Sequence, residues 1–281
     1  MAVKISFPEF PKVPARIAMA QTPRPDWSAA RLARLQAAFS MKASLEEAGP
    51  FYLARDRRSV LEVFQASDSV RWSLLEPDLE GRRGEFAAPS EAQAMRTADA
   101  FLAAAGLDGG ARSSGVSTVE MGTSRGAKAE PEFRTTALQV NYRYSLEGLP
   151  VFGPGAKAQV TVGAKGRVGM AYRFWREPKM VDALPTVEPG EAMQRLNSHA
   201  MFAELSERTA RVTIESVDFG YFAMPPMDVQ GHLLPVYLFR GVISTPDLER
   251  YEFTKRVIGV RLEVRQLKDS GITVAPVEPV F

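Results

Sequence analysis

Hydrophobic and polar residues alternate through residues 133–175, and this alternation constrains the fold more than any other feature of the sequence. Tyr142 and Tyr144 fall on one side of the first run and Arg143 on the other, and the same period recurs in 157–162 and 167–175. A period of two is typical of strands with one buried and one solvated face. Gly163 and Gly166 favour a hairpin turn between the last two runs. The sequence therefore predicts an antiparallel sheet in this stretch.

Three other segments have helical periodicity, at about 26–40, 90–105 and 186–197. Ser90 and Gln93 form a capping-box pattern at the start of the second, and Gly106 is placed to end it. Pro189 lies in the first turn of the third, where proline is tolerated. Further strands are predicted at about 51–54, 59–66, 70–74, 116–121, 211–223, 233–244 and 256–267.

The order of one helix followed by several strands occurs clearly from about 89 and from about 186, and more weakly from about 26. We therefore expect an α+β fold of repeated units, each with one helix packed on a curled antiparallel sheet. The expected domains are a proline-rich N-terminal arm (1–25), an N-terminal helix-plus-strands unit (26–86), two clearer units (87–182 and 183–270) and an extended C-terminal tail (271–281).

Composition excludes several classes of protein. The formal net charge of +2 predicts no nucleic-acid partner, and the absence of cysteine excludes disulfides, thiolate metal sites and a cysteine nucleophile. No apolar run approaches the roughly 18 residues that span a bilayer. With only His199 and His232 and no pairing between them, neither a metal site nor a cofactor is expected. If Met1 is the native start, a cytoplasmic location follows by default; if a signal or anchor was removed, the location is extracytoplasmic.

Two phrases carry a resemblance to a known family. SEAQAMRTADAFLAAAG precedes LQVNYRYSLEGLPVFGPGAKAQVTVGAKGRVGMAYRFWR, and VEPGEAMQRL precedes GHLLPVYLFRGVIS. Both resemble the PepSY-type module and the related YycH and YycI regulatory proteins, over roughly residues 89–245. The resemblance implies a PepSY/cystatin-like fold and a non-catalytic regulatory role in which a protein or peptide partner is bound. The sequence departs from the family in lacking a signal or membrane anchor.

The candidate binding residues come from strand ends and an apolar turn. Trp175 and Arg176 continue the 167–175 run on the side that we expect to face away from the core. We therefore expect an indole and a guanidinium to lie together on the open face of the sheet. The full set of candidates is Trp175, Arg176, Tyr172, Tyr142, Tyr144, Met224 and Met227. The spacing of the tyrosines favours core positions, with a concave binding face as the alternative, and the two methionines lie at an apolar hairpin tip.

Residues 153–158 have the G-x-G-x-x-A spacing of a dinucleotide site, but that site requires a helix after the glycines. An alternating strand follows instead, and Pro154 removes an amide donor, so we expect a turn between strands. Glu215 and Asp218 lie in a largely apolar run and are the candidate acid/base pair of an alternative, enzymatic interpretation.

Three interpretations follow from the sequence. The first is a non-catalytic binding or regulatory protein that uses the open face or an edge of an antiparallel sheet. The second is an enzyme without a recognisable motif, with a sheet-lined apolar pocket and a buried carboxylate. The third is a structural subunit of a larger assembly, and a homo-oligomer is compatible with each.

Overall fold

The computed structural model describes residues 4–75, 89–123, 130, 132–198, 211–245 and 248–262. In these ranges the strands are β1 (Lys4–Ser6), β2 (Arg16–Gln21), β3 (Glu46–Ala48), β4 (Phe51–Arg55), β5 (Ser59–Phe64), β6 (Val70–Leu74), β7 (Ala111–Thr123), β8 (Glu132–Leu146), β9 (Leu149–Phe152), β10 (Lys157–Val162), β11 (Val168–Phe174), β12 (Lys179–Pro185), β13 (Arg211–Phe222), β14 (His232–Thr245) and β15 (Leu248–Ile258). The α-helices described are α1 (Ala29–Ala38), α2 (Glu91–Ala104) and α3 (Pro189–Asn197).

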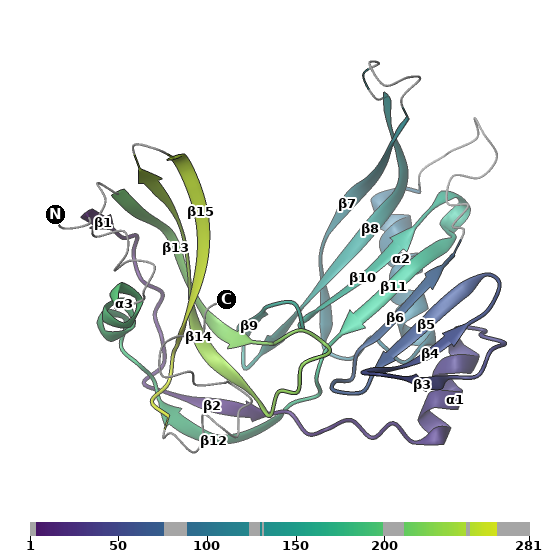
Figure 1. Ribbon diagram of the computed structural model, residues 1–281, viewed down its shortest axis with the longest axis horizontal. Helices are drawn as coiled ribbons and strands as arrows, with labels where there is room; N and C mark the ends of the chain where they lie inside the picture. The colour runs from purple at the N-terminus through teal and green to yellow at the C-terminus, as the bar shows by residue number, and fades with distance from the viewer. Residues whose placement is uncertain are drawn as a thin grey trace.

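The strands form one continuous mixed sheet in the order β12-β2-β14-β13-β9-β8-β10-β11-β6-β5-β4-β3, with β1, β7 and β15 attached beside it. β1 and β9 run parallel to β13, and the other pairs are antiparallel. Figure 1 shows two lobes side by side, with β9 between them. We call β3–β8, β10, β11, α1 and α2 the first lobe, and β1, β2, β12–β15 and α3 the second lobe.

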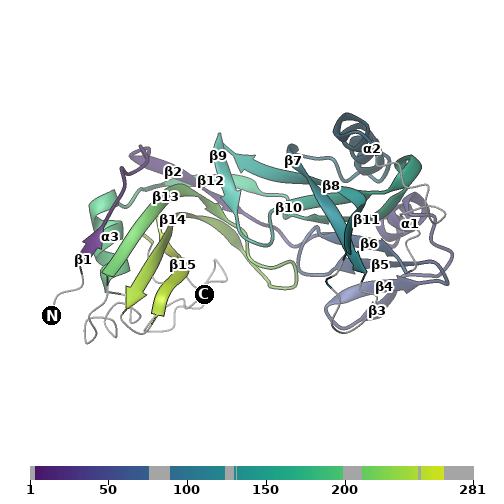
Figure 2. The same ribbon diagram turned by 90° about the horizontal axis from the view of Figure 1, so that it is seen from above.

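The core of the first lobe lies between the sheet and the two helices on one side of it. Ala98 and Leu102 of α2 are buried against Val140 and Val160, and Figure 2 shows α2 on one side of the sheet. Helix α1 adds to the same core, because its C-cap residue Phe39 stacks on Trp72 with ring centroids 5.7 Å apart. Strands from two of the predicted units therefore pack against helices on the same face of one sheet.

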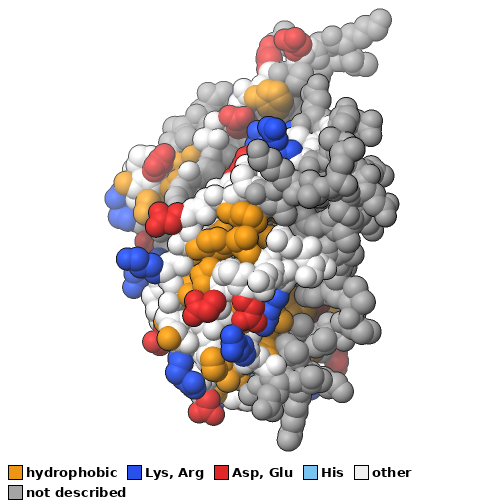
Figure 3. All heavy atoms as spheres, turned by 90° about the vertical axis from the view of Figure 1, so that its left-hand side faces the viewer, with side chains coloured by type: hydrophobic (Ala, Val, Ile, Leu, Met, Phe, Trp, Pro, Cys, Tyr) orange, Lys and Arg blue, Asp and Glu red, His pale blue; other side chains and the backbone are white. Residues whose placement is uncertain are grey.

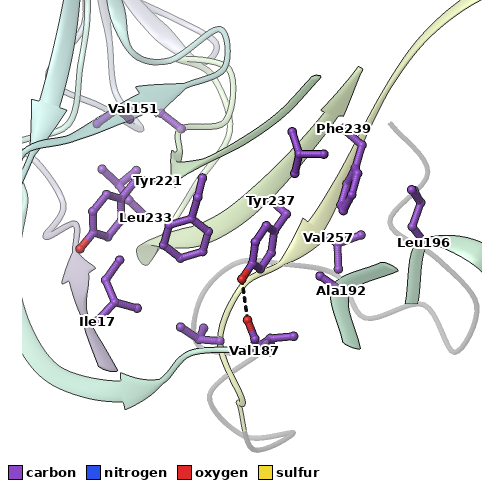
Figure 4. Packing of buried hydrophobic residues seen from close by; sticks show 14 of the residues in the cluster. Ile17, Val151, Val187, Ala192, Leu196, Tyr221, Leu233, Tyr237, Phe239 and Val257 are labelled. Atoms are coloured by element: carbon purple, nitrogen blue, oxygen red, sulfur yellow. Dashed lines mark hydrogen bonds between the residues drawn. The ribbon is translucent and has the colours of Figure 1, made fainter. Parts of the chain in front are cut away.

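The core of the second lobe is aromatic and contains buried hydroxyl groups. Tyr237 donates a 2.6 Å hydrogen bond to the carbonyl oxygen of Val187, as Figure 4 shows. Tyr221 donates a 2.8 Å hydrogen bond to the carbonyl oxygen of Ala18 on β2. These two tyrosine hydroxyls therefore have backbone acceptors, which offsets the cost of removing them from water.

Several local predictions are confirmed. Ser90 and Gln93 form a complete capping box at the start of α2, and Gly106 follows it with a φ of +65°. Pro189 begins α3, and the alternating stretch forms β8, β10 and β11 as expected. These features depend on neighbours in the sequence, which is why the pattern alone predicts them.

The proline-rich N-terminal segment was expected to be extended, and it supplies two strands to the second lobe. β1 pairs with β13, and β2 pairs with β12 and β14. Between them, Phe7, Phe10 and Val13 pack against the core as partly buried side chains. The face of the molecule that carries this end of the chain shows hydrophobic side chains gathered between charged ones (Figure 3).

The predicted fold of repeated helix-on-sheet units is wrong. β6, from the 26–86 range, pairs with β11, from the 87–182 range, and β9 joins that sheet to β13 of the second lobe. The sheet is therefore continuous, and α1 and α2 share one core. The periodicity of a strand predicts which side chains share a face but not which strand it pairs with, since pairing is decided by distant parts of the chain.

The final described strand also differs from its prediction. β15 ends at Ile258, whereas a strand was expected at about 256–267. After it, Val260 forms an isolated bridge with Thr186. His199, the tail 271–281 and the part of the predicted strand beyond residue 262 lie outside the described residues.

Candidate functional site

The two lobes meet at a junction that we define as β9 and the residues around it, 148–155. Gly153 and Gly155 approach the end of β13 so closely that a Cβ on Gly155 would stand 1.9 Å from the carbonyl oxygen of Met224. A Cβ on Gly153, whose φ is +95°, would stand 2.3 Å from the carbonyl oxygen of Ala223. The Gly155 N–H donates a 3.3 Å hydrogen bond to that same Ala223 oxygen. Only glycine fits at these two positions.

The G-x-G-x-x-A spacing therefore has a packing role at the junction. Strand β10 begins at Lys157, so no helix N-terminus follows the glycines. The expected turn between strands is confirmed, with the addition that residues 149–152 form β9.

Buried hydrogen bonds from Arg176 connect the two lobes at the junction. Its guanidinium donates to the carbonyl oxygens of Met224 at 2.8 Å, Pro225 at 2.7 Å and Asp228 at 2.5 Å. The residue is 2% exposed, and burial lowers the pKa of its guanidinium to about 10. The chain from β11 is thus tied to the loop between β13 and β14. Ser67 strengthens the link by donating a 2.8 Å hydrogen bond to the Pro226 carbonyl oxygen.

The expected position of Trp175 and Arg176 on an open face is wrong. Trp175 is buried and stacks on Tyr144, with centroids 4.0 Å apart and an interplanar angle of 7°. The side of β11 that carries Arg173 and Trp175 also carries Ala171, which packs into the core of the first lobe. The larger apolar residues of β11, among them Tyr172 and Phe174, lie on the opposite side, and Trp175 itself packs with Tyr144 in the core of the second lobe.

The other predicted binding residues do not form one surface, although Tyr144 contacts Trp175 and Met224 accepts a hydrogen bond from Arg176. Tyr142 is buried on the helix-covered face and donates a 2.7 Å hydrogen bond to Asp99. Burial, followed by this hydrogen bond, raises the pKa of the Tyr142 hydroxyl. Burial also raises the pKa of Tyr144. Met224 is half-buried at the junction, whereas Met227 is 52% exposed on the loop after it.

Glu215 and Asp218 do not form a shared acid/base site. Asp218 pairs with Arg240, and Glu215 pairs with Arg250 at 3.2 Å. Both carboxylates are exposed to solvent by nearly half of their side-chain surface. Each therefore has its own arginine partner on the surface of the second lobe.

Tyr172 is the predicted residue that does lie on an exposed part of the sheet. We define the open face as the side of the first-lobe sheet opposite α2, which Figure 2 shows free of that helix. Tyr172 stacks on Phe174 at 4.6 Å, Phe174 meets Phe64 edge-on at 5.6 Å, and Phe64 meets Phe51 at 6.2 Å. We call these four residues the aromatic row. Phe64 is buried, and the other three are partly exposed.

A ladder of amide side chains continues the open face beyond Tyr172. Gln159 of β10 lies opposite Tyr172 and donates a 2.8 Å hydrogen bond to Asn141 of β8. Asn141 in turn donates a 3.2 Å hydrogen bond to Ser117 of β7. A cavity of about 250 Å³ lies here, lined by Ser114, Asn141, Tyr142, Arg143, Val151, Gly153, Ala156, Lys157, Ala158, Gln159 and Tyr172.

The amide residues were not among the sequence candidates. The alternation did place Asn141 and Gln159 on the polar side of their strands, and that is the signal that could have found them. Their alignment with Tyr172 around one cavity depends on the register between three strands, which no local pattern contains.

A larger hollow of about 430 Å³ lies on the helix-covered side, between α1 and the end of α2. Its charged lining is largely paired: Arg31 meets Asp68 at 2.7 Å, and Arg173 pairs with Glu177. Arg173 also donates a 3.1 Å hydrogen bond to the Asp68 carbonyl oxygen. We interpret these ion pairs as structural, because they hold α1 and the β5–β6 turn against the sheet.

In the described ranges, no group of three or more His, Asp or Glu side chains is arranged to hold a metal ion. None of the helices in the described parts of the chain is long and apolar enough to cross a bilayer.

Comparisons with known proteins bear on the fold alone. No family model and no curated protein matches the sequence. The chain is similar to the crystal structure of an uncharacterized protein from Eubacterium rectale, with a TM-score of 0.50 and 7% identity. The match covers 92% of this chain and 90% of that one, so the two share an architecture over nearly their whole length.

Proposed function

We propose that this is a non-catalytic binding protein that engages an extended peptide, or an extended segment of a protein partner, on the open face of the first lobe. The resemblance of residues 89–245 to PepSY-type modules suggests that the binding is regulatory.

The observation that carries the proposal is the aromatic row. Tyr172 and Phe174 stack face to face on the side of the sheet without a helix, and both are partly exposed. Aromatic side chains supply large contact areas at low entropic cost, and they are enriched at the centres of binding sites. On the helix-covered face, by contrast, Tyr142 and Trp72 are buried within the protein's own core.

The amide ladder adds hydrogen-bonding groups beside these rings. An extended peptide laid across the strands would place apolar side chains on Tyr172 and backbone groups near Gln159, whereas the Asn141 amide is bonded to Gln139, Gln159 and Ser117 within the sheet. Side-chain amides both donate and accept, so they suit a peptide backbone, which presents both kinds of group.

The proposal is tested by selecting peptides from a displayed random library on the immobilised protein and measuring their affinities by fluorescence anisotropy. We expect Tyr172→Ala to weaken the selected peptides at least about tenfold, which corresponds to about 1.4 kcal/mol. Tyr251→Ala is the matched control, because Tyr251 is 55% exposed on β15 of the second lobe.

Failure to enrich any peptide over an empty support would contradict the proposal. So would selected peptides that bind Tyr172→Ala and Phe174→Ala as tightly as the unmodified protein. Circular dichroism melts of each variant establish that the sheet has kept its fold.

A further inference from the structure

Three cationic side chains lie directly opposite one another on the open face. Arg143 of β8 pairs in register with Arg112 of β7 on one side and with Lys157 of β10 on the other. All three are exposed. We call them the cation row. Adjacent strands are about 4.8 Å apart, so the row spans about 10 Å across the sheet.

Such an arrangement is unfavourable within the protein itself. Like charges directly opposite each other on neighbouring strands repel and destabilise the pairing. Within the described residues none of the three forms an ion pair with a carboxylate, in contrast to Arg71 one row away, which pairs with Glu62. The stability of the sheet therefore gives no reason for this row.

The surroundings reinforce the positive charge. Arg143 and Lys157 line the 250 Å³ cavity together with Asn141 and Gln159, and its described lining contains no Asp or Glu. A cavity lined by charges of one sign attracts ligands of the opposite sign.

The cation row also touches the aromatic row. The Lys157 ammonium stands 5.7 Å from the centre of the Tyr172 ring, and Lys157 lies opposite Phe174 in the pairing of β10 with β11. A ligand bound at the cations therefore lies within reach of an aromatic platform.

We propose that the segment bound on the open face is acidic: its carboxylates lie on Arg112, Arg143 and Lys157, and a neighbouring apolar side chain lies on Tyr172 and Phe174. This inference rests on the proposed function and specifies the chemistry of the partner. Guanidinium groups bind carboxylates through two parallel hydrogen bonds, so two arginines side by side suit two acidic side chains of one chain. An inorganic polyanion would use the cations but not the rings, and this is why we favour an acidic peptide.

The experiment uses the full chain and two dye-labelled probes of equal length. One contains three glutamates and two phenylalanines, and the other has glutamine in place of each glutamate. The test variant is Arg143→Gln with Lys157→Gln. The control variant is Lys179→Gln with Arg211→Gln, two exposed cations of the second lobe. Both double variants lower the net charge of +2 by two, so they differ only in where the charge is lost.

We expect the glutamate probe to bind at least about tenfold more tightly than the glutamine probe, with the difference shrinking as salt rises above about 0.15 M. The test variant should lose about tenfold or more in affinity for the glutamate probe, and the control variant should bind it as the unmodified protein does.

Three outcomes overturn the inference. If both probes bind with equal affinity and Tyr172→Ala weakens both, the bound segment need not be acidic, but the proposed peptide binding stands. Absence of glutamate-probe binding up to about 1 mM, a weak-affinity limit, also overturns it, and the library selection then decides the proposed function separately. Polyphosphate binding that is lost in the test variant but unchanged in Tyr172→Ala would identify a polyanion site instead.

Discussion

The junction and the open face use arginine in opposite ways. At the junction Arg176 is 2% exposed and donates to three backbone carbonyl oxygens, so its hydrogen-bonding capacity is directed within the protein. On the open face Arg112 and Arg143 are exposed, lie opposite each other and have no carboxylate partner among the described residues. The two regions show that burial and hydrogen-bond partners, and not residue type, distinguish a structural arginine from one that is available to a ligand. It can be tested by matched substitutions in the two regions.

The largest effect is expected from Gly155→Ala. The new Cβ would meet the backbone oxygen of Met224 at 1.9 Å, and neither chain can move without disturbing the junction. We expect a loss of about 3 kcal/mol or more in the free energy of unfolding. Urea denaturation measures it.

Gly190→Ala is the matched control, since nothing lies within 4 Å of its Cβ position and it lies in α3. It should leave stability unchanged or raise it by up to about 1 kcal/mol. Equal stability of the two variants would mean that the junction is not closely packed.

Arg176→Gln should cost nearly as much, about 3 kcal/mol, because it removes a buried donor group from several carbonyl oxygens. The same substitution on the open face, Arg143→Gln, serves as the comparison. Thermal melts of both variants in one buffer would show a large decrease in Tm for the first alone. A Tm of Arg176→Gln equal to that of the unmodified protein would contradict the structural role.

Alkaline pH should weaken the second lobe through its buried tyrosines. Burial raises the pKa of Tyr221 to about 12, above the value near 10 of an unfolded tyrosine. Its contribution to stability is therefore complete below about pH 10 and is lost as pH rises through 12.

Tyr221→Phe should be less stable near neutral pH by about 1 kcal/mol, since it loses the hydrogen bond to Ala18. It should also lose less stability than the unmodified protein between about pH 8 and about pH 11. Urea midpoints at the two pH values give the comparison, and an identical pH dependence in both proteins would refute the assignment.

The smallest effect is expected from Arg143→Gln itself. Removing the central member of the cation row relieves repulsion from Arg112 and Lys157, so stability should rise by a few tenths of a kcal/mol. A clear decrease would indicate that the row stabilises the sheet and would weaken the argument that it serves a ligand. High-precision urea titration at low salt is the measurement.

Sequence reasoning succeeded where structure depends on near neighbours. The Ser90 capping box, Pro189 at the start of α3 and the alternation of β8, β10 and β11 were all predictable. It failed for β9, whose four residues include a proline and show no period. It also expected Trp175 on an open face, because Tyr172 and Phe174 make the opposite side of β11 the more apolar one.

The residues of the candidate site were likewise predicted only in part. Tyr172 was predicted and lies on the open face, whereas the cation row joins residues 112, 143 and 157 from three strands. Arg112 lies in a stretch rich in glycine and serine that gave no strand signal, and the structure extends β7 through it.

The alternation of the central strands, the N-terminal cap of α2 and the absence of cysteine chemistry can be read from the amino-acid sequence. The tertiary structure alone decided that one sheet spans both lobes, which side of β11 meets α2 and which cations lie opposite one another. The physical reason is that side-chain periodicity is a property of a single strand, whereas pairing and register depend on contacts between residues far apart in the chain.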